Sequence, residues 1–223
     1  MYFFFSSPTF TNVIISDNSA TYGGGMYLLS SSPTFTNVTF SGNSATYGGG
    51  ILFLFNIHSG LDGSSPTLTN SILWGNSPDE IYFWEFESAG HSITISYSDI
   101  QGGEAGIVAN DGTVYWEDGN IDADPLFCDA ENGDLTIQSD SPLLGAGQDG
   151  TDMGAYGVGC EPFIAGDVTQ DGLVNVLDIV LLVNWILSDT SLTDLEVSIA
   201  DMTNDGLVNV LDIVALVNII LNP

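Results

Sequence analysis

Hydrophobic and polar residues alternate along the first part of the chain in a pattern that returns every 25 residues. Residues 7–12 (SPTFTN) recur as residues 32–37, and residues 18–25 (NSATYGGG) recur as residues 43–50. A third copy begins at Ser65, after an inserted segment. Each unit alternates Thr or Ser with Val, Ile or Phe, has glycine-rich corners and lacks a helical period. This pattern predicts a parallel β-solenoid with one repeat per coil.

Equivalent residues of a β-solenoid stack in columns about 4.8 Å apart. We expect an inward-facing column made of Phe10, Phe35 and Leu68. We expect a polar ladder at one corner, where side-chain amides satisfy backbone groups of the turns, made of Asn18, Asn43 and Asn76. The triple glycines could suggest a phosphate-binding loop, but no helix and no cation follow them. They are therefore interpreted as corners.

The end of the chain has a different repeat, with a shift of 34 residues, in which residues 167–178 return as residues 201–212. Oxygen-bearing residues stand at loop positions 1, 3, 5, 9 and 12, glycine stands at position 6, and position 7 offers its carbonyl, which is the spacing of a calcium loop. The ligands expected in the first loop are Asp167, Thr169, Asp171, Leu173, Asn175 and Asp178. Those expected in the second are Asp201, Thr203, Asp205, Leu207, Asn209 and Asp212. Two Ca²⁺ sites are predicted; the alternative is a pair of acidic turns without metal.

A nearly uniform apolar helix is predicted after each loop, at residues 176–187 and 210–221. A helix that is apolar on almost every face must be buried on almost every face. Two such short helices cannot cover each other completely, so part of their surface should meet a partner. The expected partner contacts are Val176, Leu177, Leu181, Trp185, Val210, Leu211 and Ile219. The alternative is a tight intramolecular pair with a modest exposed patch.

Composition excludes several classes of function. The chain has 29 acidic residues, no Lys and no Arg, so its formal charge is −29. Nucleic acids and anionic membrane surfaces are excluded as partners because both require basic residues. Apolar stretches are too short for a membrane span. Bound metal ions could compensate this negative charge. The acidic residues are unevenly distributed, since residues 1–78 contain only Asp17 and Asp62.

The chain contains two cysteines, Cys128 and Cys160. They could form a disulfide, which would suit an oxidising compartment, or remain two buried thiols. We expect the disulfide, because both cysteines flank a loop-rich stretch without strong patterning. Closing this loop would contribute roughly 3–4 kcal/mol in the chain-entropy model.

The SPTFTN, GNSA and triple-glycine repeats resemble the right-handed parallel β-helix repeats of bacterial surface and secreted proteins. The sequences of residues 93–103 and 120–127 resemble the same β-helix proteins. The resemblance implies a mainly β fold, a right-handed parallel β-helix over residues 1–160 whose C-terminal capping section starts near residue 106.

The two loops with their short helices resemble dockerin modules, including Asp at loop position 12. The resemblance covers residues 166–222 and implies a small α-helical domain over residues 161–223 with two EF-hand-like calcium loops and a cohesin-like partner. Thr169 and Thr203 depart from the family, which usually has Asn or Asp at loop position 3. Basic residues typical of cohesin-facing helices are also absent.

Catalysis is not expected, although some β-helix proteins degrade pectin. Those lyases and hydrolases depend on Arg or Lys, which this chain lacks. His58 and His91 lie in variable insertions, and the carboxylate pairs lie in loops where solvation or calcium binding accounts for them. Several aromatic residues could stack on a glycan, although core filling and subunit contact are favoured for them: Trp74, Tyr82, Phe83, Trp84, Phe86, Tyr115 and Trp116.

These observations favour a secreted, extracellular or cell-surface structural protein without catalytic activity. Met1-Tyr2 aligns with Met26-Tyr27, so the chain begins inside a repeat without a signal peptide, and either coils precede it or another element completes the first coil. Contact of the tail with this open coil would join copies head to tail into filaments. The alternatives are a monomeric surface or adhesion module docked to a cohesin-like receptor and, least favoured, a calcium-dependent polysaccharide enzyme.

Overall fold

The computed structural model describes residues 1–54, 63–84, 90–160, 163–188 and 191–221. His58, Asp62 and Phe86 lie outside these residues. The chain divides into two compact units, residues 1–160 and residues 161–223. Each unit is described by itself.

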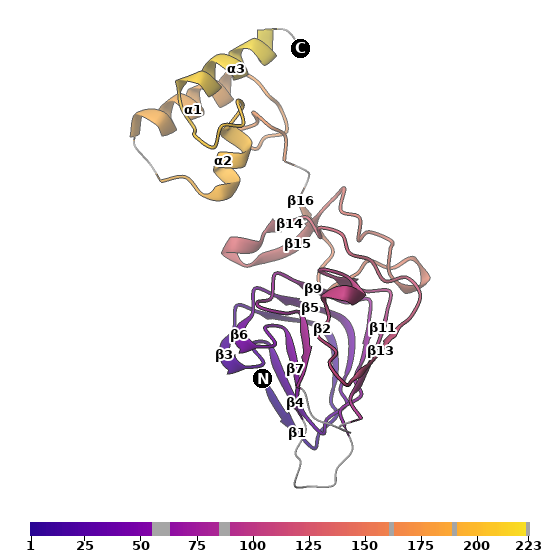
Figure 1. The fold of residues 1–223 in the computed structure, drawn as a ribbon. Helices are drawn as coiled ribbons and strands as arrows, with labels where there is room; N and C mark the ends of the chain where they lie inside the picture. The colour runs from indigo at the N-terminus through magenta and orange to yellow at the C-terminus, as the bar shows by residue number, and fades with distance from the viewer. Residues whose placement is uncertain (55–62, 85–89, 161–162, 189–190, 222–223) are drawn as a thin grey trace. The chain divides into compact units, whose positions relative to one another are not determined.

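The first unit is a parallel β-solenoid in which short strands of successive coils lie side by side (Figure 1). Its first three coils contain β1 (Tyr2–Phe4), β2 (Thr9–Ser16), β3 (Ser19–Tyr22), β4 (Met26–Leu29), β5 (Thr34–Ser41), β6 (Ser44–Tyr47), β7 (Ile51–Leu54), β8 (Thr67–Thr69) and β9 (Ile72–Trp74). Later coils contain β10 (Ile81–Phe83), β11 (Ser92–Ser96), β12 (Asp99–Ile100) and β13 (Thr113–Trp116). Strands β1, β4, β7 and β10 form one face, and β2 pairs with β5 on another.

The register of the strands follows the sequence repeat. Phe10 pairs with Phe35 across β2 and β5, and Phe35 pairs with Leu68 across β5 and β8. The rings of Phe10 and Phe35 stack with centroids 5.3 Å apart, and Phe35 and Leu68 are fully buried. The predicted inward column is thus confirmed, because in-register pairing of successive coils places these three apolar side chains at equivalent positions.

The asparagine ladder is confirmed as well. The side-chain amide of Asn18 donates to Oδ1 of Asn43 at 2.9 Å, and that of Asn43 donates to Oδ1 of Asn76 at 2.7 Å. The same oxygens accept the backbone N–H groups of Asn18 and Asn43. The ladder therefore satisfies buried polar groups at a corner where the strands are interrupted.

The triple glycines form corners of the coils, as expected. The N–H groups of residues 23–25 donate to the carbonyls of Tyr47, Gly48 and Gly49 in the next coil. A Cβ atom on Gly24 would lie 2.5 Å from the carbonyl oxygen of Gly49. Only glycine permits this approach of two backbones.

A small sheet ends the first unit. It contains β14 (Phe127–Asp129), β15 (Asp134–Gln138) and β16 (Val158–Cys160), with β14 antiparallel and β16 parallel to β15. A disulfide joins Cys128 to Cys160, across Cα atoms 6.0 Å apart. Short 3₁₀ turns η2 (Ala130–Asn132) and η3 (Gln148–Gly150) lie between the strands of this sheet, and η1 (Glu104–Gly106) lies earlier, between β12 and β13.

The aromatic residues singled out in the sequence have different environments. Phe83 is buried in the core, Trp116 packs against the same core, and Trp74 packs against the cluster around Ile137 and Leu143. These three residues fill the interior, in agreement with the alternative of core filling. The others in the described residues are Tyr115, which is exposed, and Tyr82 and Trp84, which are half-buried.

In the part of the second unit that the structure describes there are three helices, α1 (Val176–Ser188), α2 (Asp194–Ala200) and α3 (Val210–Leu221). Its core is formed by Val168, Leu182, Ile199, Ala200 and Leu216. Helices α1 and α3 were predicted, but α2 was not. A capping box starts α2, since the Glu196 N–H donates to the Thr193 hydroxyl and the Thr193 N–H donates to the Glu196 carboxylate.

Candidate functional site

The first acidic loop is fastened to helix α1 by Asp178, which is fully buried in the first turn of that helix. Its Oδ1 accepts from the backbone N–H and the hydroxyl of Thr169, both at 2.8 Å. Its Oδ2 accepts from the backbone N–H of Asn175 at 2.7 Å. The last position of the loop therefore holds the third and the ninth positions in place.

Asp167 organises the first half of the same loop. Its two carboxylate oxygens accept the N–H groups of Asp171 at 3.1 Å and of Gly172 at 2.7 Å. Gly172 adopts a φ of 83°, the left-handed conformation that a sharp turn needs. The carbonyl of Leu173 accepts from the side-chain amide of Asn175. All six residues expected in this loop are thus placed in one short turn.

The second loop repeats this network with a shift of 34 residues. Asp212 is fully buried and accepts from the N–H and hydroxyl of Thr203 and from the N–H of Asn209. Asp201 accepts from the N–H groups of Asp205 and Gly206. The two loops are therefore duplicates in hydrogen bonding as well as in sequence.

The donor chemistry of each loop fits calcium, which prefers hard oxygen ligands. Each loop offers three carboxylates, an asparagine oxygen, a threonine hydroxyl and a main-chain carbonyl, and it offers neither imidazole nor thiolate. Within the described residues, no three acidic, histidine or cysteine side chains form a cluster that could hold a metal ion. The carboxylates of the two acidic loops instead accept hydrogen bonds from the loop backbone.

The buried carboxylate of Asp178 stays ionised. Burial raises the pKa of Asp178, but the hydrogen bonds from Asn175 and Thr169 outweigh burial and hold the pKa below its usual value. In Asp201, hydrogen bonds from the N–H groups of Gly206 and Asp205 likewise outweigh desolvation and lower the pKa. Since the chain has no Lys or Arg, no basic side chain balances these charges.

Apolar side chains beside the two loops are exposed in matching pairs. Val176 and Val210 are each 61% exposed, and Leu177 and Leu211 are each 56% exposed. Three further pairs of exposed side chains were missed in the sequence, although their recurrence at a shift of 34 was a usable signal. They are Leu173 with Leu207, Val180 with Val214, and Leu187 with Leu221.

The predicted partner contacts are not all on this surface. Val176, Leu177, Val210, Leu211 and Ile219 are exposed. Two others, at positions 181 and 185, are half-buried and pack against the core of the second unit. Their sequence equivalents in the second repeat are Ala215 and Ile219, so the duplication is not exact at these helix positions.

Comparison with protein-family models matches residues 165–221 to the dockerin type I domain. Neither the curated proteins nor the solved structures that were compared include a match to the chain. Dockerin domains are non-catalytic assembly modules that bind cohesin partners, bind calcium in general and occur in extracellular or cell-surface proteins. None of the helices in the described residues combines the length and the apolar character that crossing a membrane requires. Residues 165–221 are therefore a dockerin type I domain, and a parallel β-solenoid precedes it.

Proposed function

We propose that this chain is a secreted, non-catalytic structural protein whose β-solenoid is attached to an extracellular assembly by its dockerin domain. The observation that carries the proposal is the duplicated apolar surface beside the two acidic loops. Val176 and Leu177 in the first repeat match Val210 and Leu211 in the second in both identity and exposure. Exposed apolar side chains that recur in both repeats in this way indicate surfaces that a partner covers.

Calcium is proposed to hold both loops in the shape that presents this surface. The ligands would be the six residues of each loop, Asp167 to Asp178 and Asp201 to Asp212. Bound calcium supplies positive charge to carboxylates that have no basic partner in the chain. The exposed leucines Leu173 and Leu207 lie within the loops themselves, so the order of the loops bears directly on docking.

Isothermal titration calorimetry with a panel of recombinant type I cohesin domains tests the docking proposal. We expect the full chain to bind at least one of them in millimolar calcium and to lose binding in a chelator. Because the two apolar pairs are equivalent, we expect Val176→Ser with Leu177→Ser, or Val210→Ser with Leu211→Ser, to weaken binding only partly. All four substitutions together should abolish it.

The matched control is Val158→Ser, which removes another exposed apolar side chain, from the first unit. Circular dichroism of each variant checks that the helices remain folded. The docking proposal fails if no cohesin binds the calcium-loaded chain, or if the fourfold variant binds as the unmodified chain does.

Assembly into filaments is a second candidate, favoured by exposed apolar side chains of the first coil. Phe4 and Phe5 are both exposed, and exposed apolar side chains can be covered by another copy of the chain. Asp17 is the one acidic residue of the first coil, so charge repulsion between copies is low there.

Electron microscopy of the purified chain, with calcium and with a chelator, tests this second candidate. Filaments that disappear on chelation would support head-to-tail contact between the dockerin domain and the first coil. Single particles in both conditions would reject self-assembly and leave cohesin docking unaffected.

A glycan is the other partner proposed for this chain, and the surface that would bind it lies on the β-solenoid.

A further inference from the structure

Tyrosines mark one outer face of the β-solenoid. In the sheet formed by β1, β4, β7 and β10, Tyr2 pairs with Tyr27, and Tyr82 occupies the same register two strands further. The position between Tyr27 and Tyr82 is held by Leu52, which is buried. The neighbouring positions Phe3 and Phe83 belong to the interior, where Phe83 is buried and Phe3 packs against the core. The amphipathic aromatics are thus placed outside and phenylalanines inside, because adjacent side chains of a strand point to opposite faces.

A second column of tyrosines joins this face. Tyr22 pairs with Tyr47 across β3 and β6, and their rings stack with centroids 5.8 Å apart at an angle of 10°. Trp84 lies edge-on against both rings, with centroids 5.7 Å from Tyr22 and 4.9 Å from Tyr47. It also contacts Tyr82 at 6.2 Å. These contacts join the two columns into one aromatic surface, defined by Tyr2, Tyr22, Tyr27, Tyr47, Tyr82 and Trp84.

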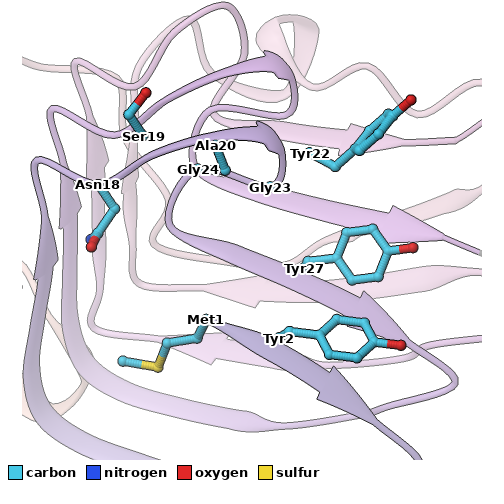
Figure 2. A pocket seen from close by; sticks show the side chains of 9 residues that line it. All are labelled: Met1, Tyr2, Asn18, Ser19, Ala20, Tyr22, Gly23, Gly24 and Tyr27. Atoms are coloured by element: carbon cyan, nitrogen blue, oxygen red, sulfur yellow. The ribbon is translucent and has the colours of Figure 1, made fainter.

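A hollow of about 620 Å³ lies at one end of the aromatic surface. Figure 2 shows Tyr2, Tyr22 and Tyr27 extending to the same side of it, with their hydroxyls at the same end. Burial, together with the neighbouring phenols of Tyr2 and Tyr22, raises the pKa of Tyr27, so this hydroxyl stays protonated. Asn18 and Ser19 add polar groups to the wall.

The chemistry of the surface selects the class of ligand. No acidic or basic side chain is among the described residues that line the hollow. A phosphorylated or uronic-acid polymer would be repelled by a chain of formal charge −29 that has no Lys or Arg. The surface offers instead flat apolar rings with hydroxyl groups at their edges. A neutral polymer with apolar ring faces and many hydroxyls, namely a neutral polysaccharide, matches both properties.

We propose that the aromatic surface binds a neutral polysaccharide, with sugar rings packed against Tyr22, Tyr47 and Trp84 and sugar hydroxyls bonded to the tyrosine hydroxyls, Asn18 and Ser19. The two columns rise along the solenoid axis, with ring centroids 4.9 Å apart for Tyr2 and Tyr27 and 5.8 Å apart for Tyr22 and Tyr47. The surface thus gives the β-solenoid a binding function separate from dockerin docking.

Affinity electrophoresis of the full chain in native gels tests this proposal. The gels contain hydroxyethyl cellulose, mixed-linkage β-glucan or galactomannan as neutral probes, and polygalacturonate as the anionic probe. We expect retardation by at least one neutral probe and none by polygalacturonate. Tyr22→Ala and Trp84→Ala should each weaken binding about tenfold or more, as is common for aromatic anchors of a binding surface, whereas Tyr22→Phe should retain most of it.

Tyr156→Ala is the matched control, since Tyr156 is similarly exposed but lies outside the aromatic surface. Thermal unfolding identifies any variant that has lost its fold. Comparison of the binding of Tyr22→Phe with that of Tyr22→Ala separates loss of the hydroxyl from loss of the ring. The proposal is overturned if no neutral probe retards the chain, if polygalacturonate retards it as much as the neutral probes do, or if Tyr156→Ala weakens binding as much as Tyr22→Ala. Retardation that persists in the fourfold dockerin variant shows that this site is independent of cohesin docking.

Discussion

The backbone N–H of Asn76 donates to Oε1 of Glu80 at 3.0 Å, and its side-chain amide donates to Oε2 of the same carboxylate. Glu80 therefore ends the asparagine ladder, taking the place that the amide of the next asparagine occupies in the earlier coils. In those coils a single oxygen of Asn43 or Asn76 accepts both donors. At the end of the ladder, the two carboxylate oxygens share them.

Replacing Glu80 should expose how much the end of the ladder contributes. Glu80→Ala leaves the backbone N–H of Asn76 and one N–H of its side-chain amide without acceptors in a buried corner, at a cost of about 1–3 kcal/mol for each donor. The other N–H of the amide still donates to the carbonyl of Phe40. Glu80→Gln keeps one acceptor and should lose less. Urea unfolding measures the free energy in each case, with Asp79→Ala as the control. Equal stability of Glu80→Ala and the unmodified chain would contradict the role of Glu80.

The β-solenoid should become less stable as the pH rises toward neutrality. Burial raises the pKa of Glu80 to about 7, against the hydrogen bonds from Asn76 and with a smaller contribution from Asp79. Burial also raises the pKa of Asp99 to about 7, with contributions from Asp122, Asp124 and Glu80. Each carboxyl binds its proton more tightly in the folded state. Its stabilisation is therefore complete below its unfolded pKa and is lost as the pH rises through about 7, with a slope of up to about 1.4 kcal/mol per pH unit.

His91 has the opposite effect, because burial lowers its pKa to about 4. Its contribution increases as the pH rises from about 4 to its ordinary value of 6.5. We expect the double variant Glu80→Gln, Asp99→Asn to gain unfolding free energy as the pH rises in this range, where the unmodified chain loses it. A Trp185→Phe background leaves only the solenoid tryptophans to report unfolding by fluorescence. An unchanged slope in the double variant would rule out these two carboxyls as its source.

The calcium stoichiometry should follow the two buried aspartates. Asp178→Ala removes the side chain that holds both halves of the first loop, and Asp212→Ala does the same in the second loop. We expect each substitution to remove one Ca²⁺ from two in equilibrium dialysis and to loosen the affected loop. Asp149→Ala, at an exposed aspartate of the β-solenoid, is the control. Unchanged stoichiometry in both loop variants would refute the assignment.

The disulfide between Cys128 and Cys160 should stabilise the β-solenoid alone. It closes a loop with a sequence separation of 32 residues, for which the chain-entropy model gives about 3–4 kcal/mol. Cys128→Ala with Cys160→Ala should lower the free energy of unfolding by about this amount in the Trp185→Phe background. The far-ultraviolet helical signal of the dockerin domain should remain. A β-solenoid that unfolds at the same urea concentration with and without the cysteines would contradict this expectation.

The repeats alone determined the two architectures of this protein. A shift of 25 residues predicts which side chains stack, because each coil of a solenoid contacts only its neighbours, and Phe10, Phe35 and Leu68 follow that rule. The acidic loops are similarly local, since the buried and the first carboxylate of each loop accept hydrogen bonds from residues of the same loop. Sequence spacing is sufficient wherever the contacts recur at one period.

Tertiary structure decided what lies outside that period. Glu80 ends the ladder only because an irregular coil brings it to the corner of Asn76, and burial there sets its protonation. The ring of Trp84 contacts the rings of Tyr22 and Tyr47, although Trp84 lies outside the residues of the 25-residue and the 34-residue sequence repeats. Among the apolar positions of α1, packing against α3 and the core decides which stay exposed, as in Val176, and which turn inward, as in Trp185. Exposure depends on which other element covers a residue, and a local pattern does not contain that information.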